Sequence, residues 1–218
     1  EPLSYALYRD AGVPAPRSTY ARVQVSAPGV HTNHYLGLYS IVENPDNRWA
    51  EARFGSKKGA IFIPPYDNRD VVLGQGTVGL EILDQLEGVD SILVAIGGGG
   101  LAAGLAVAAK LKAKAQGRKI KIIGVQSANA ASYVPSIKSG KVTQIATKPT
   151  IADGIAVAKP GQIPFELIKT HIDKIVTVTD DDIAKAIVTL LERSKLVVEP
   201  AGAVTVAALM TGAFKPKG

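Results

Sequence analysis

Four consecutive glycines, Gly97 to Gly100, constrain the fold of this chain more than any other feature. They follow the apolar run 89–96, which is typical of a β-strand buried on both faces. The apolar run 101–116 comes directly after them and predicts a helix. Glycines at such a junction let successive backbone N–H groups converge, and the helix adds its positive N-terminus. The pattern therefore predicts a phosphate-binding loop at the carboxyl end of a strand.

Strands and helices alternate through residues 58–218. The sequence predicts strands at 89–96, 120–125 and 174–179, and helices at 77–86, 101–116, 164–172 and from Thr179 onward. Asp182 follows Thr179 by three residues, which is a capping-box pattern. This alternation predicts an α/β domain with an open, twisted, mainly parallel sheet and flanking helices.

The first part of the chain has a different composition. Residues 1–57 hold seven of the twelve aromatic residues, whereas the remainder is rich in Ala, Val, Ile and Gly. A helical stripe near residues 3–7 precedes two alternating runs, 21–25 and 35–42, that predict a hairpin joined by a polar loop. We therefore expect two segments, a small α+β segment at 1–57 and the α/β domain at 58–218.

Charge and composition exclude several classes of protein. The chain carries a formal net charge of +6 and no cysteine, which excludes disulfides and thiolate metal sites. Its one basic run, between Lys110 and Lys121, has no aromatic residue within it and predicts a solvated helix end rather than a nucleic-acid site. Glycines interrupt the uncharged stretch 93–109, which argues against a membrane span. No signal peptide opens the chain, so we expect a cytoplasmic location.

Histidines and aspartates do not predict a metal site. His31 and His34 lie in the predicted hairpin loop without further ligands, and His171 ends a predicted helix. The three acids Asp180 to Asp182 fall in the first turn of a predicted helix, where they complement its dipole.

The glycine loop does not match the common nucleotide motifs. Ala102 stands where a third glycine of a dinucleotide fingerprint is expected, no acidic residue occurs in 111–125, and no Walker lysine follows the loop. This favours a cofactor whose phosphate is its only anionic group. A non-catalytic phosphate-binding or cofactor-binding domain stays open as an alternative.

Four motifs carry a resemblance to a known family. They are Gly74-Gln75-Gly76-Thr77-Val78-Gly79-Leu80-Glu81, the loop Gly97–Gly100, Thr150-Ile151-Ala152-Asp153-Gly154-Ile155-Ala156-Val157 and Glu199-Pro200-Ala201-Gly202-Ala203. In this order and spacing, residues 61–213 resemble the larger domain of threonine ammonia-lyases and serine racemases, which are fold-type-II pyridoxal-phosphate enzymes.

The resemblance implies a cofactor, pyridoxal 5′-phosphate, and a set of site residues. Backbone N–H groups of the loop would bind the phosphate, Gly154 would lie against the pyridine ring, and Glu199 would act near cofactor and substrate. The phosphate-binding residues would be Gly97, Gly98, Gly99, Gly100 and Leu101. The implied reaction is β-elimination of water from L-threonine or L-serine, giving a 2-oxo acid and ammonia, in a possible homo-oligomer.

The sequence departs from the family in three places. The Ser-Phe-Lys-x-Arg-Gly-Ala motif that carries the Schiff-base lysine is missing, and Ser56-Lys57-Lys58-Gly59-Ala60 is only a faint echo of it. We identify no Schiff-base lysine and expect the chain alone to be inactive. The family's Ser-Gly-Gly-Asn motif does not follow residue 213. Gln126, Ala130 and Ser132 replace the oxygen ligands of some relatives, so we expect no metal.

Residues 3–59 resemble a second family. Leu7-Tyr8-Arg9-Asp10-Ala11-Gly12-Val13-Pro14, Tyr35–Glu43 and Arg53-Phe54-Gly55 are similar to the spore-coat CotH kinase-like family. The resemblance implies part of a nucleotide lobe, and a kinase-like fragment is a further alternative function. The family's later Asp and Asn motifs are missing, so we expect no phosphoryl transfer. Two unrelated, incomplete segments predict a chimera.

Overall fold

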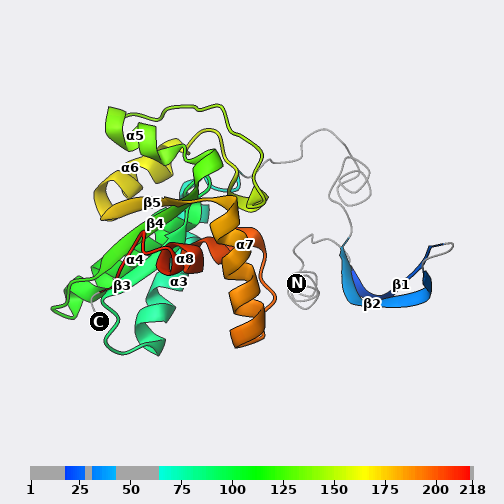
Figure 1. Cartoon of the computed structure of the whole chain (residues 1–218). Helices are drawn as coiled ribbons and strands as arrows, with labels where there is room; N and C mark the ends of the chain where they lie inside the picture. Colours follow the sequence, from blue (N-terminus) through cyan, green and yellow to red (C-terminus); the bar gives the residue numbers. More distant parts are fainter. Residues whose placement is uncertain (1–17, 28–30, 43–63, 217–218) are drawn as a thin grey trace, which may run out of the picture. The chain divides into compact units, whose positions relative to one another are not determined.

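The computed structural model describes residues 18–27, 31–42 and 64–216. The chain divides into two compact units, Glu1–Phe62 and Ile63–Gly218. Each unit is described by itself below (Figure 1). The predicted helix near residues 3–7, the boundary at residue 57 and both Lys57 and Lys58 lie outside the described residues.

The first unit contains the predicted hairpin. Strand β1 (Ser18–Ala27) pairs antiparallel with β2 (His31–Val42), from Ser18↔Val42 to Ala27↔His31, with two register shifts. The prediction that His31 and His34 lie in a loop was wrong, because both residues pair within β2. The register shifts let the ladder continue beyond the polar residues that suggested a loop.

The second unit is built on a three-stranded parallel sheet. Its strands are β3 (Ser91–Ala95), β4 (Lys121–Ser127) and β5 (Lys174–Val178), and their order is β3-β4-β5. Both pairs run parallel, with Ser91 opposite Lys121 and Ile123 opposite Lys174. The predicted α/β class with an open parallel sheet is therefore confirmed.

Helices cover both faces of this sheet (Figure 1). The helices are α3 (Arg69–Gln85), α4 (Gly100–Ala115), α5 (Tyr133–Ser139), α6 (Gln162–His171), α7 (Asp180–Thr189) and α8 (Pro200–Met210). Short helical turns occupy Ala128–Ala130 (η1), Asp153–Ile155 (η2) and Leu190–Ser194 (η3). One core cluster joins Ile92, Val94 and Ile122 to α3, α4 and α6, and another joins Ile123, Val125 and Val176 to α7 and α8. Since neighbouring strand residues face opposite ways, both faces of the sheet are buried.

Helix α3 begins eight residues earlier than the sequence predicts. Asn68 caps it, and its side chain accepts hydrogen bonds from the N–H groups of Asp70 (2.8 Å) and Val71 (3.2 Å). Gly74 and Gly76 lower helix propensity, which is why the sequence suggested a later start. A Cβ on Gly76 would lie 3.3 Å from the carbonyl oxygen of Gly104 in α4. Close packing of α3 on α4 thus outweighs the local cost of the glycine.

Residues 93–109, the uncharged stretch considered above, form the end of β3, the glycine loop and part of α4. Within the part of the chain that the structure describes, no helix is both long enough and apolar enough to cross a bilayer.

Candidate phosphate-binding site

The glycine loop joins the carboxyl end of β3 to the start of α4. The N–H of Ile96 still pairs with the carbonyl of Val125 at 2.8 Å, and the chain then turns through Gly97 and Gly98. Gly99 is the N-cap of α4 and has φ of 102°. Because side chains strongly disfavour this left-handed backbone, glycine is required at the turn.

The N–H groups of this loop are available to bind an anion. Among the described residues, none of the backbone N–H groups from Gly97 to Ala102 donates a hydrogen bond. The first intrahelical bond of α4 is that from Ala103 N–H to the Gly99 carbonyl, at 2.8 Å. Unsatisfied N–H groups at a helix start form a region of positive potential. The loop is therefore suited to hold a phosphate.

Neighbouring side chains pack closely against the loop. A Cβ on Gly98 would overlap the ring of Tyr66, and a Cβ on Gly99 would overlap the hydroxyl of Tyr133. A Cβ on Gly97 would lie 3.1 Å from the Cα of Ile155. The glycines are thus needed for space as well as for backbone conformation.

Sequence reasoning missed the polar scaffold beneath the loop. The Tyr133 hydroxyl donates to the Gly98 carbonyl (3.0 Å), which also accepts from Gly161 N–H (3.1 Å). The buried amide of Gln126 donates to the Ile96 carbonyl (3.3 Å) and accepts from Tyr133 N–H (3.0 Å). Nothing in the sequence pattern separates Tyr133 from other core aromatics, since only the folded chain places it under Gly98.

The structure brings Gly154 and Glu199 together with the loop. The turn η2 contacts Gly97 through Ile155, and Gly154 lies in that turn. A Cβ on Gly154 would lie 3.1 Å from the Cβ of Ala201 and 3.9 Å from Glu199 Oε1. Glu199 is exposed and is the N-cap residue of α8. Leu101 is 40% exposed in the first turn of α4. The candidate site therefore combines the loop, η2 and the start of α8.

Asp180 fixes the segment that leads into η2. Its carboxylate accepts from the Thr150 hydroxyl (2.5 Å) and from Ile151 N–H (3.1 Å). Asp180, Asp181 and Asp182 form the first turn of α7, as predicted, and the capping box between Thr179 and Asp182 is present.

Gln126, Ala130 and Ser132 occupy the positions where some relatives have metal ligands. Gln126 is buried and hydrogen-bonded, its amide also reaches the Ala130 carbonyl (3.5 Å), and buried Ser132 Oγ has no partner among the described residues. Residues 18–27, 31–42 and 64–216 contain no group of three or more His, Asp and Glu that could hold a metal ion. His171 ends α6, where burial and then Lys110 lower its pKa.

The fold and the loop define an α/β protein with a glycine-rich turn between the end of a parallel strand and the start of a helix. A family model described as pyridoxal-phosphate dependent enzyme matches residues 27–218. The chain belongs to this family, and the predicted cofactor is the one that the family uses.

Individual relatives agree with this assignment. The chain is 45% identical over 161 residues to the L-threonine ammonia-lyase of Thermotoga maritima, covering 74% of this chain and 39% of that enzyme. It is 46% identical over 155 residues to the catabolic L-threonine dehydratase TdcB of Escherichia coli K12, covering 71% of this chain and 46% of that enzyme. The chain thus spans less than half the length of these relatives.

Solved structures resemble this chain as well. Maize serine racemase gives a TM-score of 0.68 at 32% identity over 78% of this chain and 49% of that one. Threonine deaminase isoform 2 of Solanum lycopersicum gives 0.63 at 37% identity over 72% and 43%. The predicted resemblance to threonine ammonia-lyases and serine racemases is confirmed.

The matched range also bears on the first segment. The family model begins at residue 27, inside the stretch 3–59 that we compared with the CotH kinase-like family. No finding supports the CotH-like resemblance or a chimeric origin, and both stay predictions.

Proposed function

We propose that this chain forms the cofactor-phosphate site of a pyridoxal-phosphate-dependent ammonia-lyase. Its substrate would be L-threonine or L-serine, and its products a 2-oxo acid and ammonia. The observation that carries the proposal is the row of N–H groups from Gly97 to Ala102 that have no partner among the described residues. The relatives named threonine ammonia-lyase and threonine dehydratase support the substrate class.

The residues of the site fit the phosphate of this cofactor. The N–H groups of Gly97, Gly98, Gly99, Gly100 and Leu101 would hold the phosphate, aided by the positive start of α4. The cofactor itself would supply the electron sink for loss of the α-proton and the β-hydroxyl.

The other two site residues would act at the opposite side of the cofactor. As the family resemblance implies, the backbone of Gly154 in η2 would lie against the pyridine ring, while the absence of a Cβ leaves room for Ala201. The Glu199 carboxylate lies next to Gly154 and would accept a hydrogen bond from the cofactor or the amino acid. No residue of this chain is assigned as the Schiff-base lysine.

The complete reaction of the relatives is a proposal for this chain, because the chain spans less than half of their length. A homo-oligomer and a cytoplasmic location are part of the same proposal. Without the lysine motif, we expect the 218-residue chain to bind the cofactor without turning over the amino acid.

Binding is tested with pyridoxamine 5′-phosphate and pyridoxamine, which lack the aldehyde that reacts with surface lysines. Equilibrium dialysis should show binding of the phosphorylated compound that is at least about tenfold tighter, a difference of ~1.4 kcal/mol. Equal affinity for both compounds would contradict the assignment of the loop as a phosphate-binding site.

The lyase assignment is tested by adding pyridoxal phosphate with L-threonine or L-serine and measuring 2-oxo acid and ammonia. Equimolar products would place the complete reaction in this chain. Cofactor binding without products fits our expectation, and it is also what the non-catalytic cofactor-binding alternative requires. A longer version of the protein that binds cofactor and still forms no products would favour that alternative.

A further inference from the structure

A cavity lies at the other end of the strands from the glycine loop. Its volume is about 880 Å³, and it is lined by the starts of β3 and β4, the end of α4 and the segment after α8. Asp90, Ser91 and Lys121 mark the strand starts, whereas the glycine loop follows the end of β3. The two sites are thus separated by the length of the sheet.

Positive charge dominates the lining of this cavity. Its cationic side chains are Lys110, Lys114, Arg118, Lys119, Lys121 and Lys215. The acids of the lining are Asp90 and Asp173. Six cations face two acids, so the lining keeps a net positive charge that an anionic ligand would offset.

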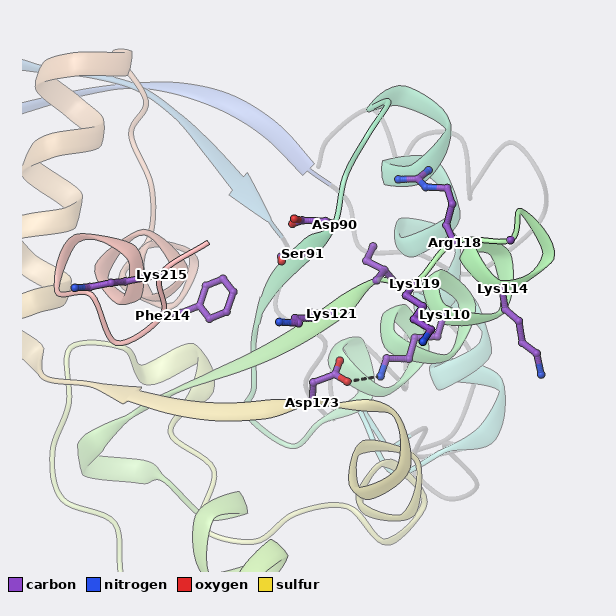
Figure 2. A pocket seen from close by; sticks show the side chains of 12 residues that line it. Asp90, Ser91, Lys110, Lys114, Arg118, Lys119, Lys121, Asp173, Phe214 and Lys215 are labelled. Carbon is purple, nitrogen blue, oxygen red and sulfur yellow. Dashed lines mark hydrogen bonds and ion pairs between the residues drawn. The ribbon is translucent and has the colours of Figure 1, made fainter. Parts of the chain in front are cut away.

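One of the two acids is already satisfied. Asp173 accepts from Lys110 Nζ at 2.8 Å (Figure 2). It also accepts from the N–H of Ile122 at 2.7 Å. Its carboxylate therefore holds Lys110 and β4 in place. Within the described part of the chain, neither Lys119 nor Lys121 forms an ion pair with an acid.

The cavity also has an apolar side. Phe214, from the segment after α8, lies on the side of the cavity toward which the Lys121 side chain extends (Figure 2). Ile120, which is buried, also lines the cavity. Arg118 is fixed by a 2.7 Å hydrogen bond to the Val89 carbonyl. The basic run predicted as a solvated helix end thus borders a cavity that a distant aromatic residue completes.

We propose that this cavity binds a small organic polyanion, a molecule that carries two or more phosphate or carboxylate groups on an apolar framework. The anionic groups would meet Lys119, Lys121 and Arg118, and the framework would pack on Phe214. Charge attraction across a partly enclosed cavity is stronger than at an open surface. The volume suits a ligand of this size. The proposal does not depend on the cofactor site.

Two probes test this proposal by calorimetric titration of the 218-residue chain. Benzene-1,3,5-tricarboxylate carries three charges on an aromatic ring, and tripolyphosphate carries charge without a ring. We expect the tricarboxylate to bind with a dissociation constant below about 1 mM. Because exposed charges are screened by salt, its affinity should fall between 50 and 500 mM NaCl, concentrations that span most of the screening range. Phe214→Ala should weaken the tricarboxylate more than tripolyphosphate.

Charge variants localise the binding. Lys119→Glu with Lys121→Glu should weaken both probes by roughly tenfold or more. Lys138→Glu with Lys148→Glu changes the net charge equally at exposed positions away from the cavity and should leave binding unchanged. Lys121→Gln provides a milder variant, and circular dichroism checks the fold of each. No binding of either probe, or equal loss in both double variants, would overturn the proposal.

Discussion

The hydroxyl of Tyr133 donates a 3.0 Å hydrogen bond to the carbonyl of Gly98, directly beneath the candidate phosphate site. Burial raises the pKa of Tyr133, and Asp67 and Tyr66 raise it further, so the hydroxyl stays protonated and remains a donor. The Gly98 carbonyl and the Gly99 N–H belong to one planar peptide unit and point in opposite directions. The hydrogen bond from Tyr133 to this carbonyl therefore directs the Gly99 N–H away from Tyr133. This places Tyr133 as a positioning residue for the loop.

Removing this hydroxyl should weaken phosphate binding. We expect Tyr133→Phe to lower the affinity for pyridoxamine 5′-phosphate several-fold and the free energy of unfolding by about 0.5–1.5 kcal/mol, as for a lost neutral hydrogen bond. The affinity for pyridoxamine should stay the same. Dialysis and urea unfolding measure these quantities.

Ser136 offers the matched control in the same helix. Its hydroxyl donates to the Ser132 carbonyl (2.7 Å) and accepts from Thr143 N–H (3.0 Å), away from the loop. Ser136→Ala should cost similar stability and leave the affinity for the phosphate unchanged. A similar loss of affinity in both variants would mean that Tyr133 acts through overall stability alone.

Alanine variants at two glycines with left-handed backbones distinguish the effect of backbone strain from an effect on the phosphate site. Gly99 has φ of 102° and Gly140, at the end of α5, has φ of 74°. Alanine at either position costs roughly 1–2 kcal/mol of backbone strain. A Cβ on Gly99 would also overlap the Tyr133 hydroxyl and lie 2.9 Å from Pro164 Cβ, whereas nothing lies within 4 Å at Gly140. We expect only Gly99→Ala to abolish phosphate binding.

Thermal unfolding and dialysis of the two variants check this expectation. Gly99→Ala should also be the less stable of the two, because the overlap adds to the strain. If Gly99→Ala bound pyridoxamine 5′-phosphate as tightly as Gly140→Ala, the loop would not be the phosphate site.

The contact between α3 and α4 predicts opposite effects at two glycines. A Cβ on Gly104 would overlap the Val72 carbonyl and lie 2.8 Å from Gly76 N. Gly104→Ala should therefore destabilise by about 1–3 kcal/mol or more, as overpacked sites do. Gly74 lies in α3 with nothing within 4 Å, so Gly74→Ala should stabilise by roughly 0.5–1 kcal/mol. Urea unfolding gives both values, and a stabilised Gly104→Ala would contradict this packing.

Local patterns were enough to predict much of this architecture. The apolar run of β3, the glycine loop and the cap at Thr179 each follow from neighbouring residues, and the structure has them where expected. The start of α3 was not predicted because its glycines disfavour a helix locally and stabilise it only through close packing on α4. Leu191 continues the apolar spacing of Ile183 and Ile187 in α7, but it is 49% exposed because the chain changes to a wider turn at η3.

Contacts between distant residues could not be predicted in the same way. Tyr133 lies 35 residues from Gly98, and Phe214 is far along the chain from Lys121, so no periodicity links them. Their roles depend on the order of strands in the sheet, which places separate segments at the same end.

The cap of α7 makes stability depend on acidic pH. Asp182 Oδ2 accepts from the Thr179 hydroxyl (2.6 Å) and N–H (3.0 Å), and these bonds lower the pKa of Asp182 from its ordinary 3.8. Since the unfolded chain binds the proton more readily, this stabilisation is complete above the ordinary pKa and is lost as pH falls through the lowered value.

Thr179→Ala should cost about 0.5–2 kcal/mol at pH 7, and the cost should shrink at pH values below the ordinary pKa. Asp181→Asn removes one negative charge from the same turn without breaking the cap, so urea unfolding across pH should show a smaller, roughly 0.3–1 kcal/mol effect at pH 7. If Thr179→Ala cost no stability at pH 7 while Asp181→Asn did, the helix dipole rather than the hydrogen bonds of the cap would account for the stabilisation.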